Sequence, residues 1–388
     1  MKNVILPLAL QLVVDDVGWH NGADERYINM PARSGLPRFH HPDDVRALNA
    51  IGEGLGMKIV CSLVIGEWDK NNRLRGVPHV TNNEAGWDAA GKMKKKYTEE
   101  YFRALEESEY LDYSLHGLCH GYFENGKLIS AAQYYPFILD ENGKRVGFKW
   151  LPEEEFAGMV DLFLAIYNDW GFKKKIVTFV SPCGCRGTNT SEGNLAYSRV
   201  LRDRGMHYWC NSWRDHDVTA DTINGLIITK GIGIIPWNAY DYDPDYIPIV
   251  GEGEFGGPTY GCHLTNFIRF HHEKNFEYVP KWINYFKKQA AVFGYMLSRD
   301  MAHTSSQAMY ERFAKLTETD CGCTIDLTDV DAQGAIALAP ELYISFRGGL
   351  EPATCEGGEI SLYEEVGDHK TYRILRGDSK TVTITYKK

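Results

Sequence analysis

The sequence has no excess of positive charge and no hydrophobic run long enough to span a membrane. Its 388 residues carry 42 Lys and Arg against 52 Asp and Glu, which gives a formal net charge of −10. Binding a nucleic-acid backbone needs a basic surface, but the one basic run, at residues 92–96, is soon followed by acidic side chains. No apolar stretch reaches the roughly 20 residues that cross a bilayer. The sequence therefore argues against nucleic-acid and membrane partners.

A secretory cleavage site is also missing. Residues 4–10, after Lys2, are as apolar as a signal-peptide core, but no small-residue cleavage site follows them. The apolar run continues instead into Asp15 and Asp16, as in a buried strand that delivers side chains to a site. The nine cysteines are an odd number, which suits reduced thiols. We therefore expect a cytoplasmic protein. The two Cys-Gly-Cys pairs are spaced more tightly than zinc-binding pairs usually are.

Strand-like and helix-like segments alternate along most of the chain. The strand candidates are residues 4–14, 58–66, 111–116, 175–181, 205–210, 225–236 and a stretch within 258–270. The helical patterns are at 43–56, 93–109, 152–170, 194–204 and 278–294. This alternation predicts an α/β fold with a parallel sheet, and about seven such units favour closure into a distorted (β/α)7-type barrel. In a barrel of this kind, functional side chains gather where the strands end.

The pattern changes after a helical stretch at residues 296–316. Short β-rich runs follow, with Gly, Asp and Pro between them, at 335–338, 342–346, 359–363, 372–375 and 381–386. These runs predict a small antiparallel β domain. We therefore expect a barrel domain over residues 1–318 and a C-terminal β-rich domain over residues 319–388. The sequence contains no internal repeat and no low-complexity tract.

Two motifs carry the residue types of a metal site. Among the 13 histidines, His116 and His120 are the pair at four-residue spacing, and they follow a strand candidate. Asp15 and Asp16 end another, and adjacent acids there are costly unless a cation neutralises them. Separately, the histidines would fit a packing role and the acids a solvated loop. Together they predict a divalent-metal site in which one acid coordinates and the other acts as a base.

This pattern resembles the NodB-type polysaccharide deacetylases of carbohydrate esterase family 4, whose fold is a distorted (β/α) barrel. The family's Asp-Asp motif is matched by Asp15 and Asp16. Its His-[Ser/Thr]-x-x-His motif is matched by His116 and His120, with Gly117 in place of the hydroxyl residue. The resemblance covers roughly residues 1–300. It implies that Asp15 is the general base and that the other three residues bind the ion. Zn²⁺ is the expected metal, and this mixed ligand set also tolerates Co²⁺, Ni²⁺ or Fe²⁺.

Two further motifs depart from the family pattern. Residues 179–184 align with its Phe-Arg-Pro-Pro-Tyr-Gly turn, so Val180 stands where the family has Arg. Cys183 replaces the Tyr whose backbone N–H helps to hold the oxyanion, a role that any residue's amide fills. A later motif keeps Trp213 but lacks the Asp that pairs with the Arg of the family pattern. Arg186, in the same turn as Cys183, either substitutes for that Arg or is simply exposed. Because the Arg and the Asp of this ion pair are both absent, neither charge is left buried without its partner. The chain therefore resembles a divergent member.

The general acid has three candidates. His263 follows a glycine-rich segment that permits close approach of the backbone to a ligand, and Asn266 is placed to assist it. The His271 and His272 doublet matches the family's hydrophobic-x-His shape more literally, through Phe270 and His272. We favour His263 as the acid that protonates the leaving nitrogen. Each of the three also fits a structural, hydrogen-bonded role.

We therefore expect a metal-dependent hydrolase that removes N-acetyl or other N-acyl groups from a carbohydrate. One alternative is a catalytically silent carbohydrate-binding barrel, and another is a glycoside hydrolase with paired carboxylates, including Glu67. Amidohydrolase-type barrels are disfavoured because the sequence contains no His-x-His. Trp19, Trp68 and Trp237 either line a substrate cleft or pack at its rim. The sugar and the oligomeric state are left open.

Overall fold

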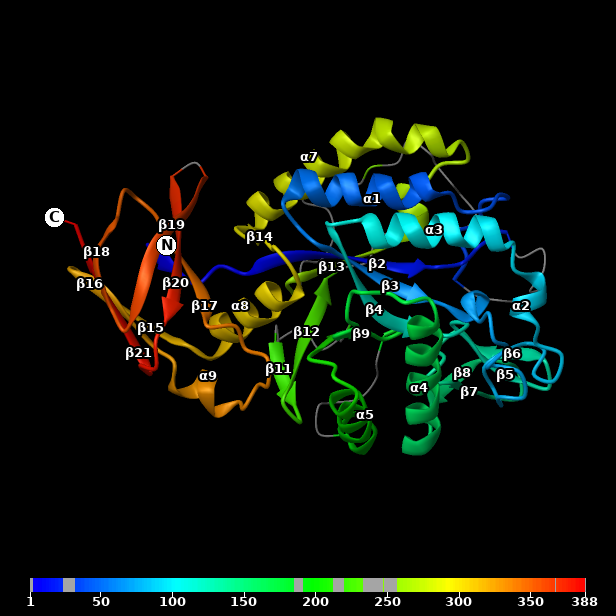
Figure 1. Cartoon of the computed structure of the whole chain (residues 1–388). Coiled ribbons are helices and arrows are strands. Elements are labelled where there is room, and N and C mark those ends of the chain that lie inside the picture. Colours follow the sequence, from blue (N-terminus) through cyan, green and yellow to red (C-terminus); the bar gives the residue numbers. More distant parts are fainter. Residues whose placement is uncertain are drawn as a thin grey trace.

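The computed structural model describes residues 3–23, 32–184, 191–211, 220–232, 247, 257–366 and 368–387. Within them, parallel strands close a barrel in the order β2, β3, β4, β9, β10, β12, β13 and back to β2 (Figure 1). Their bounds are β2 Ala9–Val17, β3 Ile59–Val64, β4 Leu111–Gly117, β9 Thr178–Val180, β10 Tyr208–Asn211, β12 Leu226–Ile232 and β13 Thr259–His263. The ring closes because β10 pairs directly with β12. The predicted seven-stranded α/β barrel is confirmed.

Two further strands extend the barrel sheet. β11 (Ala220–Ile223) pairs antiparallel with β12, and β14 (Met296–Leu297) pairs parallel with β2. β11 and β12 thus form a short hairpin between β10 and β13. Of its two strands, β12 belongs to the barrel and pairs with β10, whereas β11 lies outside the ring. Buried residues of five barrel strands pack together with α8 (Met301–Phe313), which contributes Met301, Ala308 and Met309. This helix packs against the end of the barrel where the strands begin, where Thr304 donates to the carbonyl of Ala9 at 3.1 Å.

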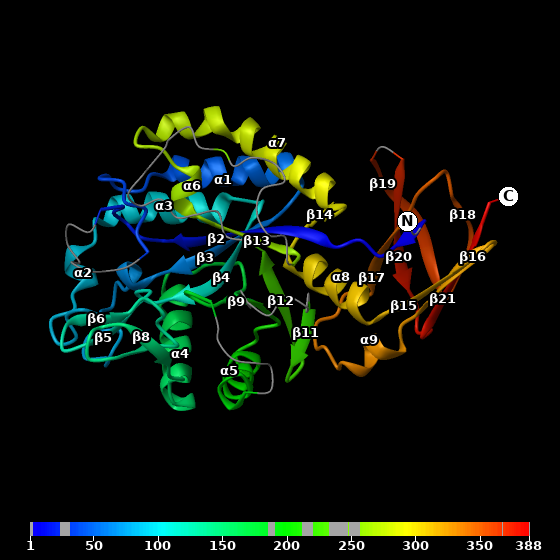
Figure 2. The ribbon, with the colours of Figure 1, turned by 180° about the vertical axis from the view of Figure 1, so that it is seen from behind.

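Helices flank the barrel as the sequence pattern predicts. α1 (Pro42–Leu55), α3 (Lys95–Glu107) and α7 (Asn275–Phe293) lie side by side, and α4 (Glu153–Asp169) packs on α5 (Glu192–Asp203) elsewhere around the ring (Figures 1 and 2). Shorter turns are α2 (Ala89–Lys92), α6 (Leu264–Phe267), α9 (Thr328–Ala332), η1 (Gly66–Trp68) and η2 (His272–Lys274). None of the helices in the described ranges is both long and apolar enough to cross a bilayer.

Two hairpins between β4 and α4 are absent from the sequence prediction. They are β5 (Tyr122–Glu124) with β6 (Lys127–Ser130), and β7 (Phe137–Leu139) with β8 (Arg145–Phe148). The turn of the first is Asn125-Gly126, with φ of 49° and 77°. An Asn-Gly pair with both residues left-handed is a strong hairpin signal. The signal was therefore present in the sequence, and the strands were missed because they are short.

The C-terminal part consists of two four-stranded sheets. One has the order β1, β17, β20, β19 and the other β15, β16, β21, β18. Their bounds are β1 Val4–Ile5, β15 Lys315–Thr319, β16 Gly322–Asp326, β17 Glu341–Phe346, β18 Pro352–Glu356, β19 Gly358–Val366, β20 His369–Arg376 and β21 Thr381–Tyr386. The predicted antiparallel β region is confirmed. The predicted run at 335–338 is wrong, because those residues lie in the connection between α9 and β17 and form no strand.

The first strand candidate, residues 4–14, is split between the two parts of the molecule. β1 pairs antiparallel with β17, whereas β2 belongs to the barrel. Pro7 lies in the gap between them, and proline cannot donate a ladder hydrogen bond. Gln307 of α8 donates to the carbonyls of Pro7 and Tyr343, at 2.8 and 3.0 Å, and so ties the gap to both parts. The division at residue 318 remains a proposal.

Candidate metal centre

Three barrel strands bring the site residues predicted from the sequence to the open end of the barrel. Asp15 and Asp16 lie near the end of β2, His116 near the end of β4 and His263 at the end of β13. His263 is also the cross-strand partner of Asp15. Parallel strands end on one side of a barrel, so these side chains meet at its mouth, on the side to which β2, β3 and β4 point in Figure 2.

Asp16, His116 and His120 converge on one point. The Nε2 atoms of His116 and His120 each lie 3.5 Å from Oδ1 of Asp16. One potential ligand atom from each residue lies within 4.8 Å of the other two. The second oxygen of Asp16, Oδ2, is 3.9 Å from Nε2 of His263. The structure thus assembles a candidate ligand triad with His263 beside it.

The backbone around the triad adopts conformations that are uncommon for residues other than glycine. Asp16, His120 and Cys183 have φ of 67°, 50° and 59°. The pairing of β2 with β3 shifts register between Val14 and Val17, so Asp16 lies in a bulge. Left-handed non-glycine residues are stabilised only by their surroundings, and bulges re-aim side chains near functional sites. The local distortion thus turns Asp16 towards the histidines.

A hydrogen bond fixes the orientation of the His116 ring. Its Nδ1 lies 2.8 Å from the carbonyl oxygen of Val180, at the end of β9. Because a carbonyl only accepts, Nδ1 carries a proton, and Nε2 is the ring nitrogen that faces Asp16. This is the usual way in which a second contact orients a ligand histidine. Val180 therefore contributes to the site through its backbone carbonyl.

Gln133 holds the turn between the two histidines and was missed by sequence reasoning. Its Oε1 accepts from the backbone N–H groups of Leu118 and Cys119, at 3.1 and 3.2 Å. A Cβ on Gly117 would lie only 2.9 Å from the same oxygen. The absence of a side chain at Gly117 thus leaves space for the Gln133 carboxamide. No local pattern predicts this partner, because it follows a hairpin.

The pKa values of Asp16, His116 and His120 shift in different directions. Burial alone would raise the pKa of Asp16, but the imidazoles of His120, His116 and His263 outweigh it and hold the pKa below its ordinary value. Burial lowers the pKa of His120 to about 4, so this ring is neutral near pH 7. Burial also opposes protonation of His116, but the charges of Asp15 and Asp16 raise its pKa. The ionised carboxylate of Asp16 thus lies beside the neutral ring of His120 and favours protonation of the ring of His116.

These residues fit a divalent metal ion. Oδ1 of Asp16 and Nε2 of His116 are buried without a hydrogen-bond partner, and such atoms are costly to leave alone. The 3.5 Å separations are close to the roughly 3.4 Å between two ligand atoms that each lie about 2.1 Å from a tetrahedral ion. A carboxylate with two imidazoles is a set that zinc and related ions accept.

The remaining predicted residues have different surroundings. Cys183 is exposed in the turn after β9, three residues beyond Val180. Trp213 and Arg186 lie outside the described residues, as does Trp237. His271 is 62% exposed, and His272 contacts Asp43 at 2.9 Å instead of Asp16. Of the three candidate acids, the structure therefore places His263 beside the triad.

Trp19 and Trp68, two of the three aromatic residues predicted at strand ends, pack in the large hydrophobic core that the strands share with the helices. Each of the two side chains is 1% exposed, so both are packing residues and neither lines a cleft. Glu67, between β3 and Trp68, is 2% exposed and pairs with Arg33 at 2.9 Å. Burial would raise the pKa of Glu67, but Arg33 and His20 hold it below its ordinary value. A carboxylate kept ionised in this way is poorly suited to act as a general acid.

Comparison with known proteins adds fold similarities. No protein-family model and no curated protein sequence matches the chain. A structure described as a polysaccharide deacetylase from Mycobacterium smegmatis is 11% identical, with 80% of this chain and 93% of that chain covered and a TM-score of 0.40. The 4-alpha-glucanotransferase from Thermococcus litoralis is 10% identical, with 78% and 40% covered and a TM-score of 0.39. The catalytic domain of GH30 xylanase C from Talaromyces cellulolyticus is 8% identical, with 100% of both chains covered and a TM-score of 0.34. These TM-scores do not identify a family, so the function rests on the site.

Proposed function

We propose that the chain is a metal-dependent deacetylase that removes N-acetyl groups from a carbohydrate. The observation that carries the proposal is the convergence of Asp16, His116 and His120 at the barrel mouth, with Asp15 and His263 on adjacent strands beside them. These are the ligands, base and acid that amide hydrolysis needs. The resemblance to NodB-type deacetylases, argued from the same residues, supplies the substrate class.

In this proposal Asp16, His116 and His120 hold the ion, with Zn²⁺ as the expected metal and Co²⁺, Ni²⁺ or Fe²⁺ as compatible ones. When bound, the ion supplies Lewis-acid polarisation of the acetyl carbonyl. Val180 keeps the lone pair of His116 directed into the site through the 2.8 Å hydrogen bond to Nδ1. The triad thus fixes where the acetyl group must lie.

Asp15 acts as the general base. It follows the apolar segment of β2 and is less buried than Asp16, which is directed towards the histidines. Oδ1 of Asp15 has no hydrogen-bond partner, so it can accept the proton of the attacking water. The backbone N–H of Cys183 and the side chain of Trp213 are proposed to contact the substrate, with the amide donating to the developing oxyanion.

His263 acts as the general acid. As the strand partner of Asp15, it approaches the scissile bond from the neighbouring strand. Asn266 accepts from the backbone N–H of His263 at 2.8 Å and fixes the start of α6 at this point. A protonated imidazole here delivers its proton to the leaving nitrogen, which would otherwise depart as an unstable amide anion.

The test is acetate release from N-acetylated chito-oligosaccharides by metal-stripped and zinc-reloaded protein. We expect release only from the reloaded protein, with one new primary amine per acetate. Asp15→Asn should lower kcat by about 10²–10⁴-fold and still retain zinc, because it removes the base and keeps the ligands. Asp112→Asn, at the start of β4 and so at the opposite end of the barrel, is the matched control and should keep wild-type activity. Chelator-insensitive release of reducing sugar would support the glycoside hydrolase alternative. Zinc-loaded protein that binds oligosaccharide and frees no acetate would support the silent barrel.

A further inference from the structure

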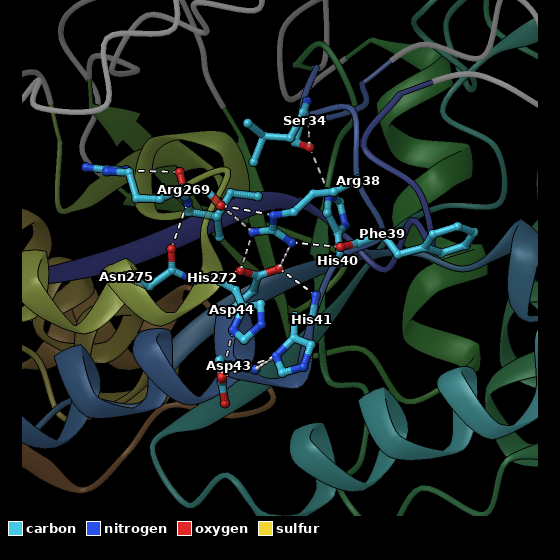
Figure 3. A network of polar contacts seen from close by, with 12 residues as sticks. Ser34, Arg38, Phe39, His40, His41, Asp43, Asp44, Arg269, His272 and Asn275 are labelled. Atoms are coloured by element: carbon cyan, nitrogen blue, oxygen red, sulfur yellow. Dashed lines mark hydrogen bonds and ion pairs between the residues drawn. The ribbon is translucent and has the colours of Figure 1, made fainter.

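A second group of metal-ligating side chains lies where α1 meets η2. His41 and Asp43 stand at the start of α1, and His272 lies 229 residues further along the chain from Asp43 (Figure 3). Oδ2 of Asp43 is 2.9 Å from Nδ1 of His272 and 3.3 Å from Nδ1 of His41. One potential ligand atom from each residue lies within 4.8 Å of the other two. The proposed deacetylation uses none of these residues.

A buried polar network stabilises the backbone that carries these three side chains. Asp44 is fully buried and accepts from both terminal nitrogens of Arg38, at 2.8 and 2.7 Å, and from Asn275 at 2.7 Å (Figure 3). Arg38 also donates to the carbonyl oxygen of Arg269, and Asn275 accepts from the N–H of Arg269 at 2.7 Å. These bonds fix the segment before α1 against the segment before α7. The backbone positions of the donor residues are therefore fixed relative to one another.

The donor atoms are also accessible to an ion. The side chains of His41, Asp43 and His272 are 37%, 21% and 35% exposed. Arg46 contacts Asp43 at 2.9 Å, but through Oδ1, so Oδ2 is left to the imidazoles. An exposed pair of this kind contributes little and does not compete strongly. Two imidazoles and a carboxylate, with water at the open positions, suit borderline divalent ions.

We propose that His41, Asp43 and His272 form a second metal site, which binds a divalent transition-metal ion such as Zn²⁺ or Ni²⁺. The site joins the connection that follows β2 to the connection that follows β13. These two strands deliver Asp15, Asp16 and His263, so the ion fastens together the two loops that flank the candidate metal centre. This inference is independent of the proposed deacetylase activity.

Binding requires a small local change. The rings of His41 and His272 are stacked, with centroids 3.5 Å apart and planes 13° apart, so their lone pairs run nearly parallel. To coordinate one ion, the half-exposed rings rotate about their side-chain bonds and open the stack. His41 also gives up its acceptor role towards the N–H of Asp43, now at 3.2 Å. The ion replaces these contacts with stronger ones between the same residues.

Metal counting separates this site from the triad. Metal-stripped full-length protein is dialysed against Zn²⁺, or Ni²⁺ in a parallel series, and bound metal is measured by mass spectrometry. We expect two equivalents in the wild type, one in His272→Ala, one in His116→Ala and none in the double variant. The affinity for the lost equivalent should fall by roughly 100-fold or more, since changes around a ligand already cost 10–100-fold. Two equivalents in His272→Ala would overturn the second site.

A matched control lies next to the site. His271→Ala removes an imidazole that is 62% exposed, contacts Glu273 and is not part of the cluster, so both equivalents should remain. If His272→Ala does not fold by circular dichroism, Asp43→Asn replaces it, because this change keeps the side-chain shape and removes the charge. A wild type with a single equivalent that His116→Ala removes would overturn the second site and leave the proposed deacetylase centre intact. Two equivalents that survive in His116→Ala would instead contradict the deacetylase centre.

Discussion

Replacing Gln133 tests how the turn between the two ligand histidines is held. Gln133→Met keeps a long unbranched side chain in this fully buried position but removes the acceptor oxygen. The buried N–H groups of Leu118 and Cys119 then lose their partner. His120 follows directly in a left-handed conformation, with φ of 50°, that local propensity does not favour. We therefore expect the turn to relax and His120 to leave its position beside Asp16.

The expected loss of stability in Gln133→Met follows from the two backbone N–H groups that lose their acceptor. Each buried, unsatisfied N–H costs about 1–3 kcal/mol, and partial relaxation of the turn recovers some of this. We expect the free energy of unfolding to fall by about 2–4 kcal/mol. Metal affinity at the triad should weaken by roughly 10–100-fold, as for loss of other contacts that orient ligands. Gln133→Glu keeps an acceptor oxygen for both N–H groups and should lose much less affinity.

The assay pairs urea denaturation with zinc competition against a chromophoric chelator, following the equivalent that His116→Ala removes. A purely structural role for Gln133 would lower stability in both variants and leave zinc affinity unchanged. Wild-type zinc affinity in folded Gln133→Met, confirmed by circular dichroism, would refute the reasoning. Equal losses in the Met and Glu variants would refute the role of the acceptor oxygen.

Two further predictions concern the loop between β2 and α1. Burial and Arg38 lower the pKa of His40 to about 4, although Asp44 opposes them. Between about pH 6.5 and pH 4 the unfolded chain therefore binds a proton at His40 that the native state does not bind. Stability should fall as pH drops through this window by up to about 1.4 kcal/mol per pH unit, and His40→Gln should show a shallower fall in urea titrations; parallel curves would contradict this. Arg33→Met removes the cation that is paired with the buried carboxylate of Glu67 and should cost about 3–5 kcal/mol in the same assay. The double change Arg33→Met with Glu67→Gln should recover much of that loss, and additive losses would contradict the pairing.

The barrel could be predicted because its strands are apolar runs separated by amphipathic helices of ordinary length. The closure of the barrel could not be predicted. It depends on the pairing of β10 with β12, which skips β11 in the chain order, and no local pattern encodes that contact. The division of residues 4–14 was missed for a related reason. Both halves of this run are apolar, and only Pro7 marks the point where the chain passes from one sheet to the other.

The candidate site was only partly readable from the sequence. Residue type and spacing predicted a metal site among Asp15, Asp16, His116 and His120, and the resemblance to NodB-type deacetylases implied that Asp16 is the acid that binds the ion. The left-handed backbone of Asp16 and His120 is imposed by tertiary contacts and has no sequence signature. The same holds for the carbonyl of Val180 and the carboxamide of Gln133, which orient the ligands from distant segments.

The most direct test of the central claim is an anomalous difference map from a crystal grown with Zn²⁺ and measured at the zinc absorption edge. We predict a peak about 2.0–2.2 Å from a carboxylate oxygen of Asp16 and from the Nε2 atoms of His116 and His120. The peak should be absent in His116→Ala. Full zinc occupancy elsewhere, with no peak among these three side chains, would contradict the claim that they form a metal centre.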